Sequence, residues 1–207
     1  MYAVHDVFRR ALGDAPAQIT SVSDGDKERA QRLGDYLGEV LWLLHAHHAG
    51  EDELLYPLLE QRAPEHKELF ERMGSEHTAV STSLGSATSA VERFGASASL
   101  ADGQAAAAAC ASLLAVTDQH LTEEEKEVLP VAARTITAPE WGALPGHALS
   151  HYHGQRLWLP LGLVLEAMPN DMRDNLLPHL PPPVLGMWTG GGSAAFADEM
   201  AYVRGGS

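Results

Sequence analysis

The sequence predicts an all-α protein, an antiparallel up-down-up-down four-helix bundle with an additional C-terminal helix and tail. Three observations favour this fold class. Apolar residues recur at spacings of three and four along several long segments, which is the period of an amphipathic helix. The connections between these segments are short, which favours antiparallel neighbours. Each of four segments also places at least one histidine in its apolar stripe. We therefore expect four helices to share one interior.

The bundle is expected to occupy residues 1–135. Gly13 and Pro16 predict the end of the first helix at Leu12, and Asp24 or Asp26 is a suitable N-cap for the second. The expected helices cover about residues 2–12, 26–61, 64–91 and 101–134.

Residues 136–207 are expected to form an extension that packs on the bundle. A helix over about 147–168 is apolar nearly all round, so it either crosses the bundle or forms an interface in a homodimer. The Pro-rich stretch LPHLPPPV predicts an extended connector, and TGGGSAAF predicts a flexible segment before a short terminal helix.

One eleven-residue pattern occurs twice, as HHAGEDELLYP at 47–57 and as HLTEEEKEVLP at 120–130. Each copy has a histidine followed four residues later by a glutamate, so His47 with Glu51 and His120 with Glu124 share a helix face. These side chains occupy stripe positions where leucines would otherwise lie, and buried polar groups need a partner. Imidazole with carboxylate is a ligand set for a first-row transition metal.

Two further histidines are expected to face the same interior. His77 replaces an apolar residue in the stripe of the third helix, and His5 shares a face with Phe8 and Leu12 in the first. A competing pair, His48 with Asp52, has the same spacing, but Asp52 lies off the leucine stripe. His45 and His48 flank the stripe and are interpreted as outer partners of the site or as surface groups.

This arrangement resembles the hemerythrin-like, or HHE cation-binding, family over about residues 1–135. The resemblance rests on one histidine in each of the first and third helices and HxxxE in the second and fourth. It implies a non-haem di-iron centre, in which two Fe ions are bridged by carboxylates and by an oxo or hydroxo group. The implied ligands are His5, His47, Glu51, His77, His120 and Glu124.

The chain departs from the oxygen-carrying members of that family. Positions 73 and 81, one turn from the third-helix histidine, hold Met73 and Ser81, and position 125 holds Glu125. Four inward imidazoles are therefore expected instead of five. Fewer imidazoles leave an open coordination position, which favours reaction with peroxide over reversible oxygen storage.

Composition limits the classes of partner. The chain has 14 basic and 28 acidic residues and a net charge of −14, which argues against nucleic acid and anionic membranes. No secretory leader or membrane span is expected, and the single cysteine, Cys110, fits a reducing, cytoplasmic compartment.

The leading functional hypothesis is a di-iron protein that reacts with O2, hydrogen peroxide or nitric oxide in an oxidative or stress-protective role. One alternative is a sensor of oxygen, redox state or iron, or an iron-handling module without turnover. An exposed apolar face over 157–168 would support it. A second alternative is an oxidase or oxygenase for a small organic substrate, with His147, His151 and His153 near its pocket.

Overall fold

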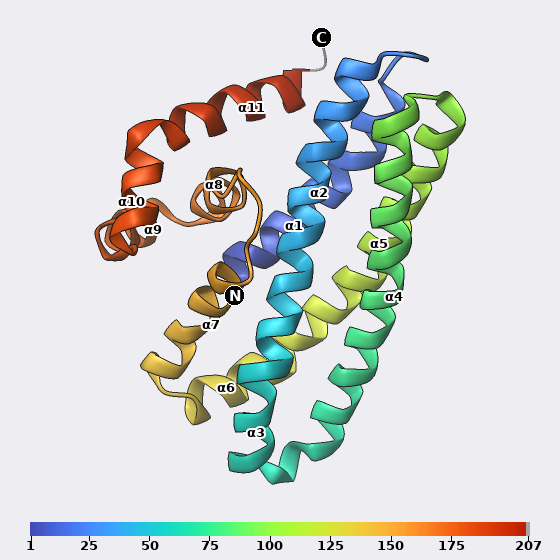
Figure 1. Cartoon of the computed structure of the whole chain (residues 1–207). Helices are drawn as coiled ribbons and strands as arrows, with labels where there is room; N and C mark the ends of the chain where they lie inside the picture. The colour runs from blue at the N-terminus through green and yellow to red at the C-terminus, as the bar shows by residue number, and fades with distance from the viewer. Residues whose placement is uncertain (206–207) are drawn as a thin grey trace.

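The computed structural model describes residues 1–205, and that part of the chain is helical and contains no strand. Four long helices form the bundle: α1 (Tyr2–Thr20), α2 (Lys27–Gly50), α4 (Lys67–Ser97) and α5 (Leu100–Glu123). They alternate in direction along the chain, and successive helices are neighbours around the bundle (Figure 1). The predicted fold class is confirmed.

Both copies of the repeated pattern contain a widened helical turn. A π-helical turn, η1 (Glu51–Leu55), joins α2 to α3 (Tyr56–Arg62), and a second, η3 (Glu124–Val128), joins α5 to α6 (Leu129–Thr135). A proline lies at the second position of α3 and of α6. Proline has no N–H and clashes with the carbonyl four residues earlier, and a wider turn relieves that clash. The turns begin at the two glutamates that the sequence predicts as ligands.

The ends of the bundle helices follow caps and burial. Asp26 caps α2 by accepting a hydrogen bond from the Arg29 N–H, and the short 3₁₀ turn η2 (Pro64–His66) leads into α4. The predicted end of the first helix at Leu12 is wrong, because α1 continues through Pro16 to Thr20. Its last turns carry Ala15 and Ile19, which are buried in the core, so packing outweighs the cost of the proline.

The extension consists of short helices where one longer helix was predicted. Its elements are α7 (Ala138–Ser150), α8 (Trp158–Ala167), α9 (Asn170–Leu176), η4 (Leu177–His179), α10 (Pro182–Met187), η5 (Trp188–Gly192) and α11 (Ser193–Gly205).

The predicted continuous helix over 147–168 is wrong, because the chain leaves the helical path between Ser150 and Trp158. There the Tyr152 hydroxyl bonds to the Glu39 carboxylate at 3.1 Å, and its ring packs against Trp42 of α2. The predicted extended Pro-rich connector is also wrong, because that stretch forms η4 and α10. The Gly-rich stretch forms η5, with a kink at Gly191, whose φ is 132°.

The extension packs against one side of the bundle (Figure 1). Leu159, Leu163 and Phe196 are buried in the same apolar cluster as the bundle core. Glu199 of α11 is buried between the guanidinium groups of Arg32 and Arg156.

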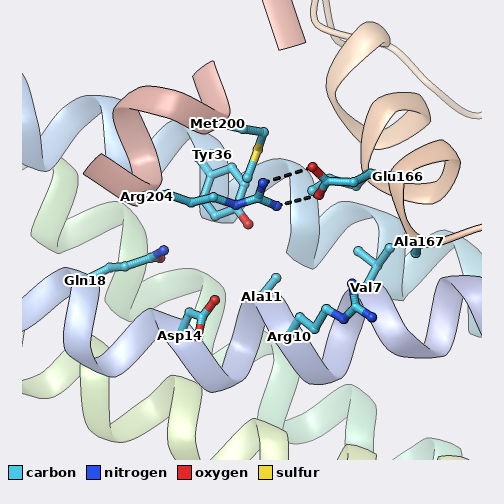
Figure 2. Close-up of a pocket in the computed structure, with 11 residues that line it drawn as sticks. Val7, Arg10, Ala11, Asp14, Gln18, Tyr36, Glu166, Ala167, Met200 and Arg204 are labelled. Atoms are coloured by element: carbon cyan, nitrogen blue, oxygen red, sulfur yellow. Dashed lines mark hydrogen bonds and ion pairs between the residues drawn. The ribbon is translucent and has the colours of Figure 1, made fainter. Parts of the chain in front are cut away.

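A second ion pair joins Arg204 of α11 to Glu166 of α8, beside a cavity of about 30 Å³ next to α1 (Figure 2). That volume accommodates about one water molecule.

Among the described residues, one helical stretch, Leu100–Thr135, is long and apolar enough to cross a membrane, judged by length and composition alone. It differs from the sequence-based expectation, which recognised no such stretch. In this structure it is a bundle helix that packs against α1 and α4 and carries two of the predicted ligands. Core helices of water-soluble bundles have the same composition.

The contact between α8 and α11 predicts that replacing glycine by alanine has opposite effects on stability at two positions. A Cβ added at Gly162 would lie 2.3 Å from the Phe196 ring, whereas one added at Gly142 of α7 would meet nothing within 4 Å. Gly142→Ala should stabilise the protein by about 0.5–1 kcal/mol through helix propensity. Gly162→Ala should destabilise it by about 1–3 kcal/mol through overpacking. Urea unfolding followed by circular dichroism measures both, and equal shifts would contradict the packing described.

Candidate metal centre

A layer of histidine and glutamate side chains divides the interior into two apolar parts. One cluster holds Leu44 and Val80 together with the core that α1, α2, α4 and α5 share with the extension. The other holds Leu55 and Met73 near α3 and α6. Between them lie five histidines and two glutamates from α1, α2, η1, α4, α5 and η3. They are His5, His47, His48, Glu51, His77, His120 and Glu124. The structure therefore brings all six sequence-predicted ligands together and adds one.

The layer resolves into two groups of four that share Glu51. The first contains His5, His47, Glu51 and Glu124, and one ligand atom from each lies within 4.8 Å of the others. The His47 Nε2 atom lies 3.4 Å from Glu51 Oε1, and the His5 Nε2 atom lies 3.3 Å from Glu124 Oε2. This group joins the first helix to both copies of the repeated pattern.

The second group contains His48, Glu51, His77 and His120 within the same 4.8 Å limit. The Nε2 atoms of His77 and His120 are 3.1 Å apart, and His77 Nε2 is 3.6 Å from Glu51 Oε2. Each carboxylate oxygen of Glu51 thus faces a histidine of a different group. Glu51 thus connects the two groups.

His48 corrects the sequence analysis. It was interpreted as an outer or surface group, but it is 8% exposed, and its ring lies 4.5 Å from that of His77. The expected count of four inward imidazoles is therefore wrong, and five face the site. The competing His48–Asp52 pair is not formed either, because Asp52 bonds to His77. Of the three histidines near this point of α2, His45 is the exposed one.

The cluster has the chemistry of a cation site. Buried polar atoms without a hydrogen-bond partner include the Nε2 atoms of His5, His47 and His48 and all four carboxylate oxygens of Glu51 and Glu124. Buried polar groups are nearly always paired, so an orphaned set of this size indicates a missing partner. Every unpaired atom is a donor that suits a transition metal, and the residues present fit such a metal.

Three ligand histidines are held by acidic residues from a neighbouring helix. Asp52 Oδ1 lies 2.6 Å from His77 Nδ1, Glu76 Oε2 lies 3.0 Å from His120 Nδ1, and Glu125 Oε1 lies 2.7 Å from His5 Nδ1. An Nδ1–H donated to a carboxylate leaves Nε2 free to bind a metal. Sequence reasoning missed these roles for Asp52 and Glu76. The available signal was that each acid adjoins a ligand in the sequence, and Glu125 does too.

The charge states also fit cation binding. Burial lowers the pKa of His5 to about 4 and that of His120 to about 3, so both imidazoles are neutral near pH 7. Burial raises the pKa of Glu124 to about 7, and burial together with the Glu124 charge raises that of Glu51. The carboxylate pair therefore carries protons below about pH 7 when no cation is present. A cation would displace them.

One edge of the layer connects to the surface. Glu125 is partly exposed, and Arg9 donates a hydrogen bond to its Oε1 atom at 2.7 Å. Burial opposes ionisation of Glu125, but the hydrogen bonds from Arg9 and His5 outweigh it and lower its pKa. Glu125 is thus a stable anion that orients His5.

Tyr56 lies beside the second group. It is the first residue of α3, its ring centroid is 5.4 Å from that of His77, and the ring planes are nearly perpendicular. Burial raises the pKa of its phenol, and the charges of Glu124 and Glu51 raise it further. Its hydroxyl is buried without a hydrogen-bond partner among the described residues. The sequence analysis did not assign Tyr56 a role.

The C-terminal histidines lie elsewhere. His147 bonds to Glu53 at 2.9 Å, and its ring stacks near that of His151. His151 and His153 line a groove of about 980 Å³ along α2 and α4, together with Trp42 and Glu39. None of the residues lining this groove belongs to the histidine and glutamate layer.

The fold and the buried ligand set define a metal-binding helical bundle. Residues 1–132 match the model of the hemerythrin HHE cation binding domain, which covers most of the chain, so this protein belongs to that family. Searches of curated proteins and of solved structures gave no match. The resemblance noted in the sequence is confirmed, and the family is one of cation-binding helical domains.

The role of His48 can be tested against a neighbour on the same helix. We expect His48→Ala to lower the metal bound per chain, because it removes one of four donors from the second group. His45→Ala, at an exposed position three residues away, should bind as much metal as the unaltered protein. Metal per chain is measured by inductively coupled plasma spectrometry after desalting. Full loading of His48→Ala would show that His48 is no ligand.

The pKa shifts predict how the stability of the metal-free protein depends on pH. His5 and His120 titrate near 4 and 3 when folded, against about 6.5 when unfolded. Between the folded and unfolded pKa values, the unfolded chain therefore binds more protons than the folded one. The free energy of unfolding falls as pH drops below 6.5, by about 3 kcal/mol for His5 alone. Glu124 affects stability in the opposite direction. Its pKa is about 7 in the folded protein, so its contribution to the free energy of unfolding is lost as pH rises from about 4.5 through 7.

We therefore expect a stability maximum near pH 6.5 for the metal-free protein, because four shifted imidazoles outnumber two carboxylates on the acid side. Urea unfolding at a series of pH values measures it. Bound metal should abolish the loss of stability above pH 6.5, because its charge pairs with both ionised carboxylates. A flat profile from pH 4.5 to 6.5 would contradict the assignment of neutral, buried imidazoles.

Proposed function

We propose that this protein holds two iron ions and reacts with O2, hydrogen peroxide or nitric oxide in an oxidative or stress-protective role. The observation that carries the proposal is the sharing of Glu51 by two four-residue groups, each with its own histidines. A single tetrahedral zinc ion needs four ligands, and seven converging side chains exceed that need. Mixed imidazole and carboxylate donors suit iron.

Each of the two four-residue groups would hold one ion. His5 and His47 would hold one ion, His48, His77 and His120 the other, and Glu51 would bridge them. Glu124 would bind on the His5 side, because its Oε2 atom lies 3.3 Å from His5 Nε2. The redox chemistry would come from bound iron, through one-electron exchange between its ferrous and ferric states.

The donor count leaves room for a small molecule. Two six-coordinate ions need about twelve donor bonds, whereas the five imidazoles and two carboxylates offer at most nine. The sequence-based argument for an open position relied on four imidazoles and no longer holds in that form. The count with five imidazoles still supports exogenous ligands.

The surrounding protein would favour small ligands over large ones. The layer lies between two buried apolar clusters, and Glu51 and Glu124 are fully buried. The acids Asp52, Glu76 and Glu125 would hold the histidines in place and keep their Nδ1 atoms protonated. Diatomic molecules and peroxide are the substrates that such an enclosed site admits most readily.

No observation favours the two alternative functions. The apolar face that would have supported a sensor is covered, because α8 buries Leu159, Leu163 and Leu165. The groove beside His151 and His153 contains none of the layer residues, so it offers no direct support for oxidation of an organic substrate.

The test is iron content per chain together with the absorption spectrum, before and after addition of hydrogen peroxide. We expect two irons per chain and an absorption change on adding peroxide. A His47→Ala, His120→Ala double variant should lose both, whereas a His45→Ala, His66→Ala double variant, altered outside the layer, should keep both. One zinc ion or no metal, unchanged in the first double variant, would refute the di-iron proposal and leave a helical interaction domain.

A further inference from the structure

Tyr56 carries a buried hydroxyl that the protein leaves unpaired. The residue is 7% exposed, and its Oη atom has no hydrogen-bond partner among the described residues. Burying an unpaired hydroxyl costs free energy that a phenylalanine of the same shape would avoid. The rest of the ring is well placed in an apolar cluster with Phe70 and Leu59. The hydroxyl therefore needs an explanation that packing does not give.

The repeated pattern shows that packing alone does not require a tyrosine here. The two copies are offset by 73 residues, so Tyr56 corresponds to Leu129, and His48 corresponds to Leu121. Both leucines are buried. One copy thus has leucines where the other has an imidazole shortly before the widened turn and a phenol directly after it. Both additions lie on the His77 side of the layer.

The position of Tyr56 is set by the backbone. It follows η1 directly and is the first residue of α3, with a helical backbone at φ −60° and ψ −40°. Its ring is held edge-on against His77, with an angle of 83° between the planes. A phenol has an ordinary pKa near 10, so the hydroxyl carries its proton at pH 7 and is a hydrogen-bond donor.

We propose that the Tyr56 hydroxyl donates a hydrogen bond to the small exogenous ligand and thereby directs that ligand to the half of the site formed by His48, His77 and His120. The inference rests on the proposed function, because it assumes that the layer holds metal. The ligand class is a small molecule that is anionic or becomes so when bound, such as peroxide or, as a probe, azide. Such acceptors form the stronger hydrogen bonds. The equivalent residue of the second copy, Leu129, has no hydroxyl to donate.

The experiment is an azide titration of the iron-loaded protein followed by absorption spectroscopy. Tyr56→Phe removes only the hydroxyl and should retain two irons per chain. We expect its dissociation constant for azide to rise by about tenfold or more, as loss of a hydrogen bond to a charged group implies. Tyr36→Phe is the matched control, because Tyr36 is equally buried but lies in the other cluster, beside Arg204 (Figure 2). Its azide affinity should not change.

A second measurement uses the metal-free protein. Removing an unpaired hydroxyl should leave the urea midpoint of Tyr56→Phe unchanged or higher, whereas a hydroxyl with a structural partner would make it lower. Tyr56→Leu, which copies Leu129, should bind iron with the same weakened azide affinity.

Three results would overturn the inference. They are unchanged azide affinity in Tyr56→Phe, a lowered urea midpoint in the metal-free form, and a visible phenolate-to-iron band that Tyr56→Phe abolishes. The last would make Tyr56 a ligand instead of a donor. If the unaltered protein binds no iron pair, the proposed function fails first. If it binds the pair and azide is insensitive to Tyr56, only this inference fails.

Discussion

The constraint on which this structure depends is the burial of seven histidine and glutamate side chains in one layer of a helical core. Five imidazoles and two carboxylates occupy positions that leucines would otherwise fill, and most of their inward atoms have no protein partner. Such a layer is costly unless a cation pairs with it. Each bundle helix contributes to the layer, so the relative register of all four is tied to the same centre. Apolar clusters on both sides then fix the helices against one another.

The layer is reinforced in one direction around the bundle. Asp52 after α2 holds a histidine of α4, Glu76 of α4 holds a histidine of α5, and Glu125 after α5 holds His5 of α1. Each acid adjoins a ligand on its own helix, so a helix that positions one ligand also orients a ligand on the next. A displacement of one helix would therefore disturb two ligands. This coupling ties the orientation of three of the histidines to the register of the neighbouring helices.

The sequence predicted the bundle and six members of the layer because both depend on helical periodicity. It missed His48 because adjacent residues on a regular α-helix point about 100° apart, and periodicity alone assigns only one of them to the interior. It missed the break after Ser150 because the apolar composition of 147–168 continues across it, while the break depends on contacts of Tyr152 with Trp42 and Glu39. Contacts between distant segments are not encoded in local patterns.

The two copies of the pattern explain why the site is asymmetric. Shared features, namely the histidine, the glutamate, the widened turn and the proline, give both copies the same local frame. The two groups of the layer nevertheless differ, because Glu124 belongs only to the first and three of the five histidines belong to the second. The copies differ where leucine in one is His48 or Tyr56 in the other, and both differences fall on the same side of the layer. Because the shared features already satisfy the fold, these two residues are not required by it, and they make the two groups of the layer unequal in donors and in polarity.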